Sequence, residues 1–74
     1  MKLGNMIKKL RLEREMSQEE LSFLLDVCKD DIVLYENGKR IPTLKSLMVL
    51  VEIFGISLLD LVPEVEEHTN YFYL

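Results

Sequence analysis

Apolar residues recur at intervals of three and four along most of the 74-residue chain, which is the spacing of helices with one buried face. No segment alternates with a period of two, so strands are not expected. The first stripe predicts a helix from about Leu3 to Glu15. Its inward residues are Leu3, Met6, Ile7 and Leu10. The pattern therefore favours an all-α domain.

A second helix is expected to open at Ser17. Serine followed three residues later by Glu20 is a capping box, in which each side chain bonds the other residue's backbone amide. Leu21 and Leu25 have the spacing of its buried face. Asp26 follows where the chain must turn, and aspartate tolerates left-handed backbone better than most residues.

A third helix is predicted from about Cys28 to Glu36. Asn37 and Gly38 come next, and both tolerate the positive φ with which many helices end. The third helix is thus short and closely follows the second one.

Two more helices complete the prediction. Thr43 caps a fourth helix that runs through Phe54 and ends at Gly55. Ser57 caps a last short helix, which Pro63 terminates. We therefore expect five helices in one domain.

This domain is expected to span residues 1–62, followed by a tail at 63–74 that is first acidic and then aromatic. The tail ends in Tyr71, Phe72, Tyr73 and Leu74. We expect these side chains to pack on surplus apolar residues of the second or fourth helix, either within one chain or across a dimer.

The residue composition argues against several classes of function. The single cysteine, Cys28, allows no internal disulfide, and no His/Cys set has metal-ligand spacing, so neither a metal nor a cofactor is expected. His68 is the only histidine and has no nucleophile near it in the sequence, so we do not expect an enzyme. The longest apolar region, 47–62, is interrupted by polar residues and predicts no membrane span. No signal peptide is recognised at the N-terminus, and a soluble cytoplasmic domain is expected.

The segments "SQEELSFLLDV" and "DIVLYENGKRIPT" resemble the helix-turn-helix of the phage-repressor and Cro-type family of DNA-binding regulators. "MIKKLRLER" and "LKSLMVLVEIFGISLLDL" are similar to the helices that flank this motif in the family. The resemblance covers residues 3–62 and implies a five-helix repressor-like domain whose third helix, roughly 28–36, reads the major groove of double-stranded DNA.

The resemblance also implies which residues contact the DNA backbone. In similar proteins, the glutamine that opens the second helix and the turn after the third helix contact phosphates. The corresponding residues here are Gln18, Asn37, Lys39 and Arg40. Helix N-termini and cations are natural anion sites. The alternative is that Gln18 is merely a polar residue at the start of a helix and that Lys39 and Arg40 are solvated loop charges without a DNA contact.

The base-facing positions of the motif correspond to Cys28, Lys29, Asp30, Val33 and Leu34. Lysine is an ordinary reader of guanine, aspartate can accept from the amino group of cytosine, and leucine can contact a thymine methyl. Asp30 and Asp31 are unusual here because phosphates repel them. They can equally serve the helix, whose dipole favours carboxylates in its first turn.

Arg11 and Glu36 have a different role in the resemblance. In the family, the equivalent arginine of the first helix pairs with the glutamate that ends the third one. We therefore expect a structural ion pair and no catalytic role.

The sequence thus predicts a sequence-specific transcriptional regulator, acting as a homodimer on two half-sites about 34 Å apart. The net charge of −4 is not the basic balance typical of nucleic-acid binders. Apolar residues also stand at helix positions that are usually polar in the family: Phe23, Leu24, Val49 and Ile53. An alternative is therefore a helix-turn-helix module that binds a protein partner, such as a related repressor that it antagonises.

Overall fold

All five predicted helices are present in the computed structural model, which describes residues 2–61 of the chain. They are α1 (Lys2–Glu13), α2 (Gln18–Leu25), α3 (Lys29–Glu36), α4 (Leu44–Phe54) and α5 (Leu58–Leu61). Residues 2–61 contain no strand. The predicted all-α class is therefore confirmed.

The predicted end of α1 is wrong by two residues. The helix stops at Glu13, and the chain reverses through Glu15, whose φ is +52°. The backbone amides of Arg14 and Met16 both donate to the carbonyl of Arg11, at 3.1 and 3.0 Å, and close the turn. No glycine, asparagine or proline marks this stop, so the pattern gives no signal for it.

The other helix ends follow the predicted chemistry. Asp26 and Gly55 have left-handed backbone, with φ of +57° and +64°. After α3 it is Gly38 that takes the positive φ, +74°, whereas Asn37 keeps a helical φ of −85°. Thr43 caps α4 by accepting from the amide of Ser46 at 3.1 Å. These short, well-defined turns fix the directions of α3 and α4.

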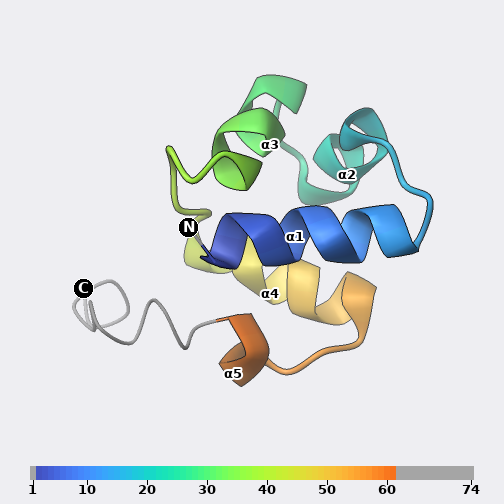
Figure 1. The fold of residues 1–74 in the computed structure, drawn as a ribbon, viewed down its shortest axis with the longest axis vertical. Coiled ribbons are helices and arrows are strands. Elements are labelled where there is room, and N and C mark those ends of the chain that lie inside the picture. Colours follow the sequence, from blue (N-terminus) through green and yellow to red (C-terminus); the bar gives the residue numbers. More distant parts are fainter. Residues whose placement is uncertain (1, 62–74) are drawn as a thin grey trace.

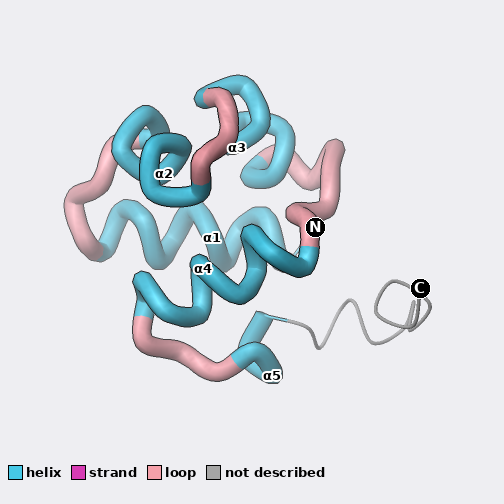
Figure 2. Tube along the Cα trace, turned by 180° about the vertical axis from the view of Figure 1, so that it is seen from behind, coloured by secondary structure: helices cyan, strands magenta, loops and turns pink. Residues whose placement is uncertain are grey.

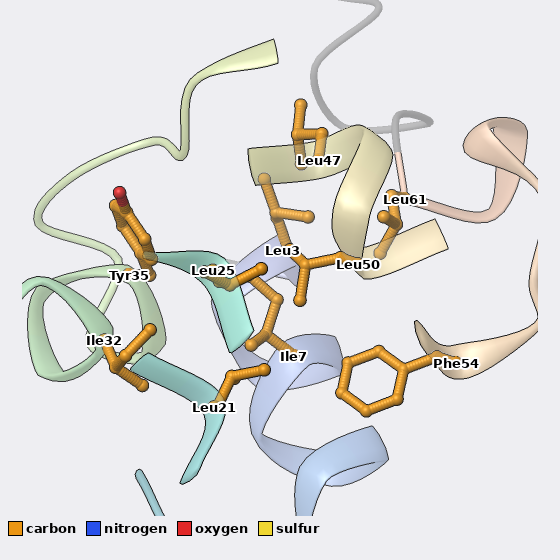
Figure 3. Packing of buried hydrophobic residues seen from close by; sticks show 10 residues of the cluster. All are labelled: Leu3, Ile7, Leu21, Leu25, Ile32, Tyr35, Leu47, Leu50, Phe54 and Leu61. Carbon is orange, nitrogen blue, oxygen red and sulfur yellow. The ribbon is translucent and has the colours of Figure 1, made fainter. Parts of the chain in front are cut away.

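The core takes side chains from every helix, and Figure 3 shows them converging. Its buried members are Leu3, Ile7, Leu21, Leu25, Ile32, Tyr35, Leu47, Leu50, Phe54 and Leu61. Met6 and Leu10 of the predicted α1 stripe are half-buried and pack against this cluster. Since each helix is too short to be stable alone, this shared burial holds the domain together.

Both ribbon views place α2 and α3 on one side of α1 and α5 on the other (Figures 1 and 2). The end of α1 is tied to α4 by Arg14, whose Nη2 donates to the carbonyl of Phe54 at 2.6 Å. The Arg14 guanidinium also lies 4.9 Å from the centre of the Phe54 ring. The helix-turn-helix pair therefore stands on a platform made by α1 and α4.

Gly4 permits the closest approach in this arrangement, and the sequence pattern did not reveal it. A Cβ atom at Gly4 would lie 2.4 Å from the carbonyl oxygen of Tyr35 and 2.8 Å from that of Glu36. Only a residue without a side chain lets α1 lie this close to the end of α3. Gly4 thus helps to set the position of α3.

Residues 62–74 lie outside the described part of the chain. The predicted end of the last helix at Pro63 and the packing of the aromatic tail fall there. The division into a domain at 1–62 and a tail at 63–74 stays a prediction.

Candidate DNA-binding surface

Short-range hydrogen bonds define both ends of α2, including the turn that leads into α3. Ser17 and Glu20 form the predicted capping box: the Glu20 amide donates to Ser17 Oγ at 3.0 Å, and the Ser17 amide donates to Glu20 Oε1 at 2.9 Å. At the other end of α2, the amide of Val27 donates to the carbonyl of Ser22 at 3.0 Å. Ser22 is buried, and its small side chain lets the two helices approach each other. The relative orientation of α2 and α3 is therefore fixed locally.

The start of α3 carries the first side chains expected to face DNA. Cys28 is the N-cap residue and is exposed. Its amide donates to Asp31 Oδ2 at 3.0 Å, so Asp31 supplies a side-chain capping bond at the start of α3. Lys29 and Asp30 are exposed on the first turn. Polar groups able to contact bases thus stand at this end of the helix.

The two apolar base-reading candidates, Val33 and Leu34, are half-buried. Ile32 and Tyr35, on the opposite side of α3, are buried in the core. The helix therefore presents one continuous outer face, polar at its start and apolar towards its end. All five predicted base-reading positions are at least partly accessible on it.

Arg11 and Glu36 form the ion pair that the resemblance implies. Arg11 Nε lies 2.7 Å from Glu36 Oε2, and Nη2 lies 3.1 Å from Oε1, which makes the contact bidentate. The side chains are only 8% and 3% exposed. Arg11 Nη1 also donates to the carbonyl of Met16 at 2.7 Å. The pair thus fastens α1 both to the end of α3 and to the start of the α2 segment.

Gln18 joins this network, which the sequence did not predict. Its Nε2 donates to Glu36 Oε1 at 3.2 Å, and the side chain is half-buried. The predicted phosphate contact therefore starts from a side chain that α3 already orients. Its position is set by contact with Glu36, not by free rotation in solvent.

The loop after α3 brings Lys39 and Arg40 back along the helix. Their backbone amides donate to the carbonyl of Leu34 at 2.9 and 3.3 Å. Lys39 and Asn37 are exposed, and within residues 2–61 no side-chain bond involves either of them. Arg40 differs, because its Nη1 lies 2.6 Å from Asp31 Oδ1. Of the cations predicted to meet phosphates, Lys39 is therefore unpaired and Arg40 is held by α3.

A shallow depression of about 450 Å³ lies beside the start of α2. It is lined by Lys8, Arg11, Ser17, Gln18, Glu19 and Lys29. Lys29 lies 3.7 Å from Glu19, and both side chains are largely exposed. Lys8 was not among the predicted contacts, although it stands three residues before Arg11 on the same face of α1. Three cations line the depression, of which Arg11 and Lys29 are paired with carboxylates and Lys8 is not within residues 2–61.

The surplus apolar residues separate into two groups. Val49 and Ile53 are half-buried and pack against the core, so the domain itself covers part of their surface. The large apolar side chains of α4 that remain exposed are Leu44 and Met48. Phe23, by contrast, is 84% exposed on α2.

Other kinds of site find little support in the described part of the chain. Within residues 2–61, no three His, Cys, Asp or Glu side chains gather as a metal site would require. No helix in this range is long and apolar enough to cross a bilayer. The outer face of α3 and its surroundings are thus the leading candidate site.

Comparisons with known proteins bear on this surface. Residues 7–61 match the helix-turn-helix family. The chain is 33% identical over 64 residues to the cryptic phage CTXphi transcriptional repressor RstR of Vibrio cholerae, covering 86% of this chain and 58% of that protein. It is also 34% identical over 67 residues to control protein C.MunI of a Mycoplasma species, covering 89% of this chain and 90% of that protein.

A third relative comes from an archaeon. An uncharacterised HTH-type transcriptional regulator of Methanocaldococcus jannaschii is 32% identical over 59 residues, which cover 80% of this chain and 89% of that protein. The matched residues include α2, α3 and most of the platform beneath them. The chain therefore belongs to the phage-repressor and Cro-type helix-turn-helix family of DNA-binding transcriptional regulators.

Proposed function

We propose that the protein is a sequence-specific, non-enzymatic regulator that places α3 in the major groove of DNA. The observation that carries this proposal is the outer face of α3. It exposes Lys29 and Asp30, while Gln18 bonds Glu36 at the end of α3 and the exposed Lys39 follows in the turn after it. The buried Arg11–Glu36 pair holds this face in one orientation relative to α1. Phosphate contacts from residues next to a reading helix give it a defined register on the duplex.

The backbone contacts are assigned to Gln18, Asn37, Lys39 and Arg40, and we add Lys8. Lys8 shares the depression with Gln18, and no ion pair neutralises it within the described residues. Phosphate contacts supply affinity without sequence preference. These five side chains therefore account for the strength of binding and not for the choice of site.

The choice of site is assigned to the outer face of α3. Lys29 would donate to guanine, Asp30 would accept from the amino group of cytosine, and Leu34 would contact a thymine methyl. Val33 and Cys28 border these positions and would contribute contact area. Lys29 must leave the exposed carboxylate of Glu19, 3.7 Å away, which costs little because such surface pairs are weak.

A homodimer is part of the proposal. An eight-residue helix contacts few base pairs, and two copies on half-sites about 34 Å apart would double the sequence that is read. The exposed Leu59 of α5 and Met48 of α4 offer apolar area to a second copy. Because the site of action is DNA, we also assign the protein to the cytoplasm.

The test is a mobility shift with genomic fragments at low and moderate salt. Wild type is expected to retard a subset of fragments, with log affinity falling linearly against log salt. Lys39→Gln should weaken binding to all fragments alike and flatten this slope by about 0.9 for each protomer bound.

Lys9→Gln is the matched control, because Lys9 is exposed and lies about 200° around α1 from Arg11. It should leave the slope unchanged. Absence of salt-dependent retardation for every fragment, even at low ionic strength, would refute the DNA-reading function.

One observation favours a second function, the binding of a protein partner. Phe23 is 84% exposed and Leu24 is 45% exposed, and Glu19, Glu20 and Asp26 stand within one helical turn of Phe23. An exposed aromatic residue surrounded by charge is typical of interaction hot spots. A partner for this surface would offer an apolar pocket with a basic rim.

A further inference from the structure

The adjacent carboxylates Asp30 and Asp31 have different surroundings. Asp30 is exposed, and no side-chain bond involves it within residues 2–61. The side chain of Asp31 is 25% exposed and both of its oxygens are engaged. Oδ2 accepts from the amide of Cys28 at 3.0 Å, and Oδ1 accepts from Arg40 Nη1 at 2.6 Å. The same charge on neighbouring residues therefore has two different roles.

Arg40 is held at both ends. Its backbone amide donates to the carbonyl of Leu34, two residues after the turn at Gly38, whose φ is +74°. Its guanidinium then reaches Asp31, nine residues earlier in the sequence. The arginine is thus fixed along the length of α3, from its last turn to its first.

The guanidinium keeps donors free for a ligand. Arginine carries five N–H groups, and Nη1 is the guanidinium nitrogen bonded to Asp31. The Arg40 side chain is 53% exposed. The planar group can therefore bond a phosphate oxygen with its outer donors while Asp31 holds its inner one.

We infer that Asp31 is a positioning residue for DNA binding: it holds the Arg40 guanidinium beside the first turn of α3, ready for a phosphate. This inference rests on the proposed DNA-reading function. It separates the effects of two adjacent carboxylates on the DNA backbone, because Asp30 only repels the phosphates, whereas Asp31 repels them and also orders Arg40. Without Asp31, an exposed arginine must be ordered at the moment of binding, and affinity falls.

The two effects of Asp31 oppose each other, so a double-mutant cycle is required to separate them. The variants are Asp31→Asn, Asp30→Asn and Arg40→Gln, with each aspartate variant also made in the Arg40→Gln background. The probe is a labelled duplex of random sequence, titrated over a series of low salt concentrations. Asparagine is chosen because its amide oxygen can still accept from the Cys28 amide.

Asp30→Asn should raise affinity by the same factor in both backgrounds, since it only removes repulsion. Asp31→Asn should raise affinity in the Arg40→Gln background. With Arg40 present, the affinity of Asp31→Asn should instead lie about 1.5- to fivefold below that of Asp30→Asn, which is the range of an exposed ion pair. Asp31→Asn should also flatten the salt slope by up to about 0.9, although a negative charge has been removed. A purely structural role would change melting temperature and leave this slope alone.

Far-UV circular dichroism and thermal melts establish that each variant is folded. If Asp31→Asn fails to fold, Asp31→Ser replaces it, because the hydroxyl still offers a short acceptor at the same position. Equal gains for Asp30→Asn and Asp31→Asn in both backgrounds would overturn the inference and leave the DNA-reading function standing. If wild type does not bind the duplex at any salt concentration, both the inference about Asp31 and the proposed DNA-reading function are refuted.

Discussion

The junction between α1 and α3 and the outer face of α3 are made from similar charged residues and behave as opposites. At the junction, Arg11 and Glu36 are almost fully buried and bidentate. On the outer face, the Lys29–Glu19 pair is largely exposed and a base can replace it, whereas the Arg40–Asp31 pair leaves half of the arginine side chain exposed to a phosphate. Buried pairs are costly to break and exposed pairs are not. The first region fixes the reading helix, and the second remains free to exchange partners.

The contrast has a geometric cause. Gly4 lets the backbone of α1 approach the end of α3 closely, and Arg11 and Glu36 are buried between the same two helices. The outer face has no element packed over it within residues 2–61. The position of a charge relative to α1 therefore decides its role. Substitutions in the two regions should accordingly separate loss of stability from loss of recognition.

The largest effect is expected at the buried pair. Arg11→Met should lower the free energy of unfolding by about 3–5 kcal/mol, because Glu36 is left buried without its cation. Gln18 Nε2, at 3.2 Å from Glu36, cannot replace that charge. Urea denaturation followed by circular dichroism measures the change.

The double variant Arg11→Met/Glu36→Leu is the control. It should recover much of the loss, since no uncompensated charge remains. A loss below about 1 kcal/mol in Arg11→Met would show that Glu36 is adequately solvated and that the two regions do not differ as described.

A smaller effect is expected at Gly4. Gly4→Ala places a methyl group 2.4 Å from the carbonyl oxygen of Tyr35, so α1 must shift. The expected loss is about 1–3 kcal/mol, although alanine is the better helix former by about 1 kcal/mol. Asn5→Ala, on the exposed side of the same helix, should change stability by less than about 0.5 kcal/mol. Equal stability of the two variants would contradict the close approach.

The sequence predicts the ion pair at the junction of α1 and α3 better than the contacts on the outer face of α3. Periodicity and capping residues predicted all five helices, and the resemblance supplied the Arg11–Glu36 pair. The approach at Gly4 left no signal, because a glycine within a helix is compatible with many packings. The Arg40–Asp31 contact spans a whole helix and a reversing loop, so it depends on the φ of Gly38, which the pattern does not fix. Contacts that rest on backbone geometry were therefore the ones missed.

On the outer face, Lys29→Gln should leave the free energy of unfolding within about 0.5 kcal/mol, because its pair with Glu19 is exposed. Recognition should respond instead. Selection from a randomised duplex library should show that preference for guanine opposite α3 falls by about 1–3 kcal/mol. Lys9→Gln removes the same charge from the side of α1 opposite Arg11 and should leave the selected sequence unchanged. A variant that keeps its guanine preference would remove Lys29 from the base-reading set.

The smallest effect on both stability and DNA affinity is expected at Phe23. Phe23→Ser removes a side chain that is 84% exposed, so unfolding should change by less than about 0.5 kcal/mol. Phe23 stands on α2, outside the outer face of α3, and duplex affinity should stay within twofold of wild type. Analytical ultracentrifugation of the same variant then shows what this surface does. If the variant sediments like wild type, Phe23 does not lie at a contact between two copies, and its surface is free to bind a different protein. Loss of a dimer would place Phe23 at the contact between two copies, and the DNA affinity of a two-site duplex would fall with it.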